Sequence, residues 1–192
     1  MNKEEELNLF ANLPTLETER LLLRKIAITD ADAMFDYAHR PEVTTYLLWQ
    51  PHKDMEHTLS YLRLLQERYR AGLFKDWAIV LKDTNRMIGT CGFTTLDLKN
   101  MSGEIGYVLN PDYRGHGLVP EAAREVIRFG FLRLDLHRIE VRIMAENEAS
   151  FRVAEKLGMH FEGWHKDAIC INDAFKTIGI CAIIKNECPY LA

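Results

Sequence analysis

The stretch DYRGHGLVPEAA, residues 112–123, constrains the fold more than any other part of the sequence. It separates a strand-like run, SGEIGYVLNP (102–111), from a run over 120–134 in which apolar residues recur at helical spacing. Gly115 and Gly117 permit unusual φ values, so the connection can be a tight turn. The chain therefore predicts a strand, a glycine turn and a helix in direct succession.

The rest of the chain adds alternating strand and helix patterns on both sides of this turn. Strands are predicted at 18–26, 76–82, 87–98, 102–111, 138–145, 160–171 and 174–185. Helices are predicted at 28–40, 53–72, 120–134 and 149–158. An antiparallel meander followed by βαβ units predicts an α/β (α+β) fold with a mixed, mostly antiparallel central sheet flanked by helices.

We expect a single domain over residues 15–187, because 192 residues suffice for one hydrophobic core. Residues 1–14 are interpreted as a loose or short helical lead-in, and residues 188–192 as a C-terminal tail. No internal repeat or low-complexity tract interrupts the sequence.

Charge and cysteine content narrow the class of protein. The formal net charge is −4, whereas nucleic acids and anionic membranes select clustered Lys and Arg. The chain has four cysteines, Cys91, Cys170, Cys181 and Cys188. None lies in a C-x-x-C pair, which favours reduced thiols over zinc or disulfides. Without a signal-peptide pattern or an apolar membrane span, we expect a cytoplasmic protein that binds neither nucleic acid nor membrane.

The glycine turn has two interpretations. The first N–H groups of a helix lack intrahelical partners and carry partial positive charge, so they can bind an anion such as phosphate. Pro120 suits a first helical position, and Arg114 can add a charge-assisted hydrogen bond. Alternatively, Gly115 and Gly117 only solve the geometry of a tight turn. Neither a G-x-G-x-x-G after an N-terminal strand nor a P-loop sequence is present, so no nucleotide site of those kinds is predicted.

The run EIGYVLNPDYRGHGLVPEA resembles the core of the GCN5-related N-acetyltransferase (GNAT) superfamily. Other segments, in family order, are similar to the RimJ/RimL-type branch, which acetylates ribosomal-protein N-termini: LETERLLLRKI, RPEVTTYLLWQP, MIGTCGF, LHRIEVRIMAENEASFRVAEKLGMHFEG and DAFKTIGICAII. The resemblance implies a GNAT-like fold, acetyl-CoA as co-substrate, no metal, and direct acetyl transfer to an amine in a ternary complex.

The resemblance implies that the turn binds the pyrophosphate of acetyl-CoA. The expected cofactor-binding residues of the turn are Arg114, Gly115, His116, Gly117, Leu118 and Val119. Val119 stands where the family usually has a small residue, although its amide can still donate. The amides near Val108 and Leu109 are expected to stabilise the oxyanion and to line the cofactor's pantetheine arm.

Two further segments are expected to supply catalytic groups. Glu104, two residues before Gly106, is the expected base, acting through water; alternatively it is a surface or ion-paired glutamate. Asn147 is expected to bind the pantetheine arm, and Ser150 to bind cofactor and protonate the departing thiolate. Alternatively these two residues form a turn and a helix cap.

The acceptor side is less constrained. Tyr46, Trp49 and Trp77, with Glu104, are expected to line a substrate pocket, although such aromatics also serve as core packing.

Two departures from family patterns affect the choice of acceptor. Ala154 stands where many members have a tyrosine, and Ile169 where some ribosomal enzymes have a glutamate. A protein N-terminus, a small amine or antibiotic, and a non-catalytic acyl-CoA-binding role therefore stay open, as does a homodimer.

Overall fold

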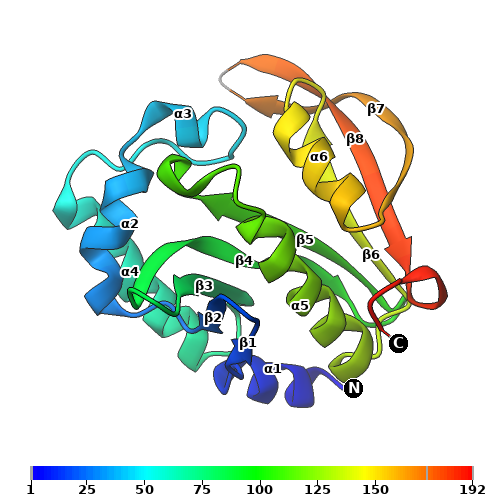
Figure 1. Cartoon of the computed structure of the whole chain (residues 1–192), viewed down its shortest axis with the longest axis horizontal. Coiled ribbons are helices and arrows are strands. Elements are labelled where there is room, and N and C mark those ends of the chain that lie inside the picture. The colour runs from blue at the N-terminus through cyan, green and yellow to red at the C-terminus, as the bar shows by residue number, and fades with distance from the viewer. Residues whose placement is uncertain (1, 172, 192) are drawn as a thin grey trace. The chain divides into compact units, whose positions relative to one another are not determined.

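The computed structural model describes residues 2–171 and 173–191, which form two compact units. Unit 1 comprises the described residues up to Gly92 together with Tyr107–Glu125. Unit 2 comprises Phe93–Gly106 together with the described residues from Val126 onward. Figure 1 labels the helices and strands used below.

Unit 1 contains an antiparallel meander. Its strands are β1 (Leu16–Glu17), β2 (Leu21–Arg24), β3 (Asp76–Leu81) and the first part of β4 (Arg86–Asp97). Each pairs antiparallel with the next, with Leu23 opposite Ile79 and Trp77 opposite Cys91. The middle of β3 is buried at every position, as expected for a strand covered on both faces.

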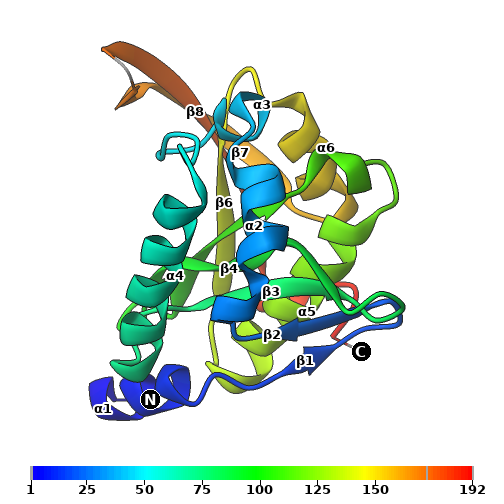
Figure 2. The same ribbon diagram turned by 90° about the vertical axis from the view of Figure 1, so that its left-hand side faces the viewer.

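The helices of unit 1 precede β3 in the chain. They are α1 (Lys3–Ala11), the 3₁₀ turn η1 (Ile28–Asp30), α2 (Ala31–Ala38), α3 (Pro41–Thr44) and α4 (Met55–Arg70). The Asp54 side chain caps α4 by accepting a hydrogen bond from the His57 N–H. Gly72, with φ of 68°, follows the end of α4. Figure 2 shows α2 beside α4, with α1 at one end of α4.

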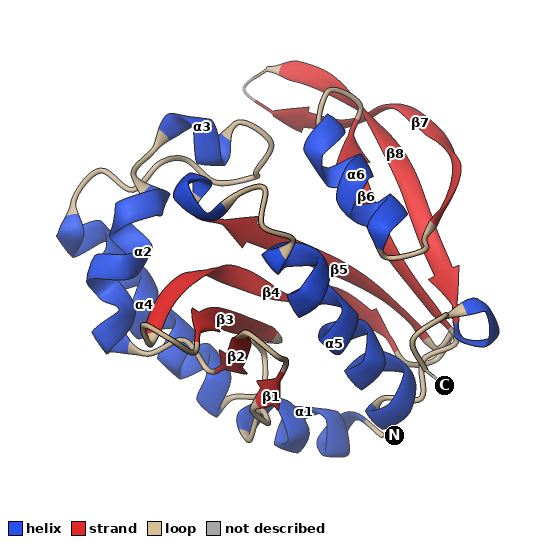
Figure 3. Cartoon of the chain, viewed as in Figure 1, coloured by secondary structure: helices blue, strands red, loops and turns tan. Residues whose placement is uncertain are grey.

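Unit 2 contains the mixed part of the sheet. Its elements include β5 (Ser102–Leu109, which ends in unit 1), β6 (Arg138–Met144), α6 (Glu148–Lys156), β7 (His160–Ile171) and β8 (Ala174–Ile184). β5 and β6 are parallel, whereas β8 pairs antiparallel with both β6 and β7. Figure 3 shows β7 and β8 as a long hairpin. The 3₁₀ turn η3 (Lys185–Glu187) follows β8.

The connection after β5 is the quoted glycine turn. It starts with the 3₁₀ turn η2 (Pro111–Tyr113) and ends at α5 (Leu118–Arg133). Helix α5 begins two residues earlier than expected, so Pro120 is its third residue rather than its first. The proline is tolerated there because the N–H of a third helical residue has no intrahelical partner either.

The strand order is β1-β2-β3-β4-β5-β6-β8-β7. This confirms the expected mixed, mostly antiparallel sheet with helices. The short helix α3 was not predicted, because four residues are too few to show a helical period. Among the described residues, no helix combines the length and apolarity required to cross a membrane.

Candidate active site

The glycine turn has the backbone conformation that its sequence predicts. Gly115 and Gly117 have φ of 84° and 74°, a region that L side chains rarely adopt. A Cβ on Gly115 would contact nothing within 4 Å, so backbone conformation rather than space requires glycine at this position. Arg114 and His116 are exposed beside these glycines.

The turn leaves a run of backbone donors unpaired. Within residues 2–171 and 173–191, the N–H groups of residues 115–119 have no hydrogen-bond acceptor. The Gly117 carbonyl already accepts from the Glu121 N–H at 3.2 Å, which closes the first turn of α5. Unpaired amides at a helix start, next to the exposed Arg114, fit a phosphate group.

Arg20 and Glu121 hold the turn from one side. The Arg20 guanidinium donates from Nη1 to the His116 carbonyl at 3.0 Å and from Nε to Glu121 at 2.7 Å. Thr18 Oγ1 and the Arg20 backbone N–H also donate to Glu121. Burial opposes ionisation of Glu121, but these donors outweigh it and lower its pKa. A carboxylate in the first turn also complements the helix dipole.

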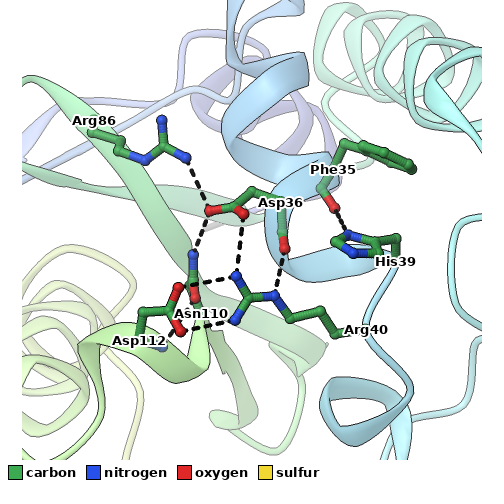
Figure 4. Close-up of polar contacts among 7 residues, drawn as sticks. All are labelled: Phe35, Asp36, His39, Arg40, Arg86, Asn110 and Asp112. Carbon is green, nitrogen blue, oxygen red and sulfur yellow. Dashed lines mark hydrogen bonds and ion pairs between the residues drawn. The ribbon is translucent and has the colours of Figure 1, made fainter.

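Asp36 on α2 organises the chain that enters the turn, as Figure 4 shows. It accepts hydrogen bonds from Asn110 Nδ2 at 3.0 Å, Arg86 Nη2 at 2.9 Å and Arg40 Nη2 at 3.2 Å. Arg40 also donates through Nη1 and Nη2 to the two carboxylate oxygens of Asp112, at 2.8 and 2.9 Å. These five residues are called the Asp36 network below.

Within the Asp36 network, Asn110 connects helix and turn. It is fully buried, its Oδ1 accepts from the Asp112 N–H at 3.1 Å, and its own N–H donates to the Ile88 carbonyl. Burial opposes ionisation of Asp36, but the donors from Arg86, Arg40 and Asn110 outweigh it and lower the Asp36 pKa. The arginine hydrogen bond likewise lowers the pKa of Asp112.

Val108 and Leu109 lie where β5 ends, and both are half-buried. Gly89 on β4 lies directly against the Val108 carbonyl and the Leu109 Cα. Any side chain at position 89 would collide with this backbone, so the close approach of β4 requires glycine. The position of the two residues agrees with the expected end-of-strand location, and their oxyanion role stays a prediction.

Glu104 belongs to unit 2 and is half-buried. Its Oε2 accepts a hydrogen bond from Thr95 Oγ1 at 3.1 Å, and it lies opposite Glu140 on the parallel strand β6. Arg138 binds Glu140 at 2.9 Å and Glu162 at 2.6 Å. Glu104 is therefore held by a hydroxyl group in an acidic part of the sheet, and its role as a base stays a prediction.

Asn147 and Ser150 meet at the start of α6. The Asn147 side chain accepts a hydrogen bond from the Ser150 N–H at 3.2 Å, so Asn147 is the N-cap of this helix. Both residues are half-buried. The alternative of a turn residue at 147 and a cap at 150 is thus shifted, because Asn147 is the cap and Ser150 is the third residue of α6; the expected contacts with a pantetheine arm stay a prediction.

The expected acceptor residues occupy different environments. Tyr46 is exposed, and the Trp49 ring lies 5.5 Å from the His52 ring, which stacks on His57 at 4.6 Å. Trp77 is fully buried and donates from Nε1 to the Pro14 carbonyl at 2.8 Å. Trp77 is therefore packed inside unit 1, and its expected place in an acceptor pocket stays a prediction.

Sequence reasoning did not identify Arg20, Asp36 or Arg40. Their contacts with the turn join residues 72 to 101 positions apart. Such pairs produce no local spacing pattern, and the segment LETERLLLRKI that contains Arg20 was noted only for its family resemblance. Asp36 and Arg40 four residues apart on a helix were the one available signal, which by itself indicates only an ordinary surface pair.

Comparison with known proteins places this geometry in a family. Residues 20–160 match the family model described as an acetyltransferase (GNAT) domain. The chain is 36% identical over 175 residues to the uncharacterized N-acetyltransferase p20 of Bacillus licheniformis, covering 91% of this chain and 98% of the relative.

Solved structures give the same result. An acetyltransferase of the GNAT family from Bacillus anthracis superposes with a TM-score of 0.80 at 30% identity, covering 91% of this chain and all of that one. The ribosomal-protein-S5-alanine acetyltransferase from Vibrio fischeri superposes with a TM-score of 0.76 at 26% identity, covering 92% of this chain and 100% of that one.

Proposed function

We propose that this chain, which belongs to the GNAT family of acetyltransferases, transfers the acetyl group of acetyl-CoA to a protein N-terminal α-amine. One observation carries the proposal: the unpaired N–H groups of residues 115–119 at the start of α5, inside the region that matches the family. Similarity to the S5-alanine acetyltransferase of Vibrio fischeri supports the choice of acceptor.

The turn and Arg114 would hold the pyrophosphate of acetyl-CoA, which supplies the acetyl group as a reactive thioester. GNAT acetyltransferases use this co-substrate. The N–H groups of residues 115–119 are the donors, and the exposed Arg114 adds a positive charge. The Val108 and Leu109 amides would stabilise negative charge on the reacting carbonyl oxygen.

The acceptor must reach the thioester as a neutral amine. At pH 7 roughly a tenth of an α-amine, with a pKa near 8, is neutral, compared with well under a hundredth of a lysine with a pKa near 10.4. Positioning therefore accounts for more of the rate with an N-terminal acceptor, and Glu104 would remove the proton through water. Ser150 would protonate the departing thiolate, and Asn147 would bind the pantetheine arm.

Calorimetric titration with acetyl-CoA tests the cofactor, and thiol release against a panel of acceptors tests the reaction. We expect binding, with release on peptides that carry a free N-terminus. Release on polyamines or aminoglycosides instead would replace the acceptor with a small amine. Binding without release on any amine would favour an acyl-CoA-binding module, and no binding would contradict the proposal.

Gly117→Glu is the sharpest variant for the turn. A side chain at φ of 74° is strained, and a carboxylate among the unpaired amides would repel the pyrophosphate. We expect acetyl-CoA binding to be lost in a variant that unfolds at a temperature near that of the parent. Unchanged affinity in this folded variant would show that the turn is not the cofactor site.

A further inference from the structure

The orientation of the peptide unit between His116 and Gly117 determines where the Gly117 N–H of the turn points. A trans peptide unit points its C=O and its N–H in opposite directions. The described chain has no cis peptide bond, so this unit is trans. A hydrogen bond to the His116 carbonyl therefore also determines where the Gly117 N–H points.

Arg20 makes that hydrogen bond. Its Nη1 donates to the His116 carbonyl at 3.0 Å, so the carbonyl points toward Arg20 and the Gly117 N–H points away from it. Gly117, with φ of 74°, forms one end of this unit, and Gly115, with φ of 84°, lies one residue before its other end; glycine backbone rotates at little steric cost. The sequence of the turn alone would thus allow the unit to flip.

Glu121 holds the Arg20 side chain in place. The Arg20 Nε and Nη2 atoms bind Glu121 Oε2 at 2.7 and 2.6 Å, while the Arg20 backbone N–H binds Oε1 at 2.9 Å. Thr18 Oγ1 donates to Oε1 as well. All donor-bearing nitrogens of the guanidinium are therefore directed at the His116 carbonyl or at the first turn of α5.

We propose that Arg20 is a positioning residue, which holds the His116–Gly117 peptide unit so that the Gly117 N–H faces the pyrophosphate of acetyl-CoA. The inference rests on the proposed function. Arg20 acts through the backbone of the turn and not through its own charge, because Glu121 already neutralises that charge.

The first experiment compares two acetyl donors in the full-length protein. Arg20→Ala should weaken acetyl-CoA binding about tenfold in calorimetry, the loss typical of one charge-assisted hydrogen bond. S-acetylpantetheine lacks the pyrophosphate, so kcat/KM with this donor should not change. A loss of kcat/KM with both donors would mean that Arg20 only supports the fold, and would overturn the inference.

A matched control removes a comparable exposed arginine. Arg63 binds Glu56 at 2.7 Å on α4, and among the described residues no hydrogen bond or ion pair is seen between Arg63 and the turn. Arg63→Ala changes the net charge by the same amount as Arg20→Ala, and its affinity for acetyl-CoA should equal that of the parent. An equal loss in both variants would point to long-range charge and contradict positioning.

Glu121→Gln separates positioning from direct contact with phosphate. If Arg20 positions the peptide unit, loosening its anchor should weaken acetyl-CoA binding several-fold. If Arg20 contacted the phosphates through its charge, removing the neighbouring carboxylate would strengthen binding. Equal or tighter binding in Glu121→Gln therefore overturns the inference. Failure of the parent protein to bind acetyl-CoA would instead overturn the proposed function.

Discussion

Two carboxylates of unit 1 show how differently this protein treats the same chemical group. Asp36 on α2 is half-exposed and accepts hydrogen bonds from Arg40, Arg86 and Asn110, and its pKa is lowered. Asp76, at the start of β3, has a buried Oδ1 without a hydrogen-bond partner among the described residues. Burial raises its pKa to about 7, although Thr90 and the Trp77 N–H donate to the carboxylate. The deeper burial of Asp76, together with the smaller number of donors to it, separates the two carboxylates.

The surroundings of Asp76 explain why donors are scarce. Gly92 lies opposite on β4, and a Cβ there would come within 2.7 Å of Asp76 Oδ1. Tyr69 directs its hydroxyl at the Asp76 backbone carbonyl, at 2.6 Å, and not at the carboxylate. Asp36 therefore stabilises the fold as an anion, whereas Asp76 is best accommodated with a proton.

Among the variants suggested by this comparison, Asp36→Ala should change the free energy of unfolding most. Asp36→Ala deletes three hydrogen bonds and leaves the buried Asn110 Nδ2 without its acceptor. We expect a loss of about 3 kcal/mol in the free energy of unfolding, measured by urea denaturation. Since Asn110 also holds the Asp112 N–H, KM for acetyl-CoA should rise as well. A loss below about 0.5 kcal/mol would show that the network is only a surface feature.

Asp76→Asn should stabilise the protein at alkaline pH. Between pH of about 4 and 7 the folded state keeps a proton on Asp76 that the unfolded chain has released, so the free energy of unfolding falls as pH rises through this window. The shift from 3.8 to about 7 corresponds to at most about 4 kcal/mol, and we expect the variant to gain about half of that at pH 8.

The gain in Asp76→Asn should become small at pH 4, where the folded parent keeps the proton and the unfolded chain has regained about half of it. Urea denaturation at pH 4, 6 and 8 measures this trend. A gain in Asp76→Asn that is equal at all three pH values would contradict the buried-proton explanation.

The lowered pKa of Asp36 predicts the opposite pH dependence of the free energy of unfolding, in a lower pH window. The contribution of Asp36 is present above pH of about 4 and is lost on further acidification.

Asp112→Asn should have the smallest effect. The carboxylate is exposed, and its bidentate pair with Arg40 is screened by water. We expect only a small loss in the free energy of unfolding, and the difference between variant and parent should largely disappear in high salt, which screens the ion pair in the parent. A loss as large as that of Asp36→Ala would mean that Asp112, and not Asp36, is the centre of the network.

The sequence predicted most elements because their patterns are local. The apolar spacing of Leu62, Leu65 and Tyr69 gave the helix α4, and the Gly72 that follows it has the left-handed φ typical of a helix end. Both glycines of the glycine turn adopt positive φ for the same local reason. The helix start at Leu118 was missed, because Pro120 is compatible with more than one position in a first turn.

The candidate site could be predicted from the sequence only where backbone groups, and not side chains, form it. The turn and the end of β5 follow from glycine positions and strand length, whereas the full burial of Trp77 does not follow from its aromatic side chain. The burial of Asp76 could not be read from the sequence either, since Asp before a strand is ordinary at a surface.

By itself, the sequence determined the order of elements, the left-handed glycines of the turn and the match to the GNAT family. These depend on interactions among residues close in the chain. Only the tertiary structure decided that Arg20 reaches the His116 carbonyl, that Asp36 holds Asn110 and that Asp76 Oδ1 is buried without a hydrogen-bond partner among the described residues. Each of these depends on groups brought together from distant parts of the chain, where distance and desolvation, not residue type, set the energy.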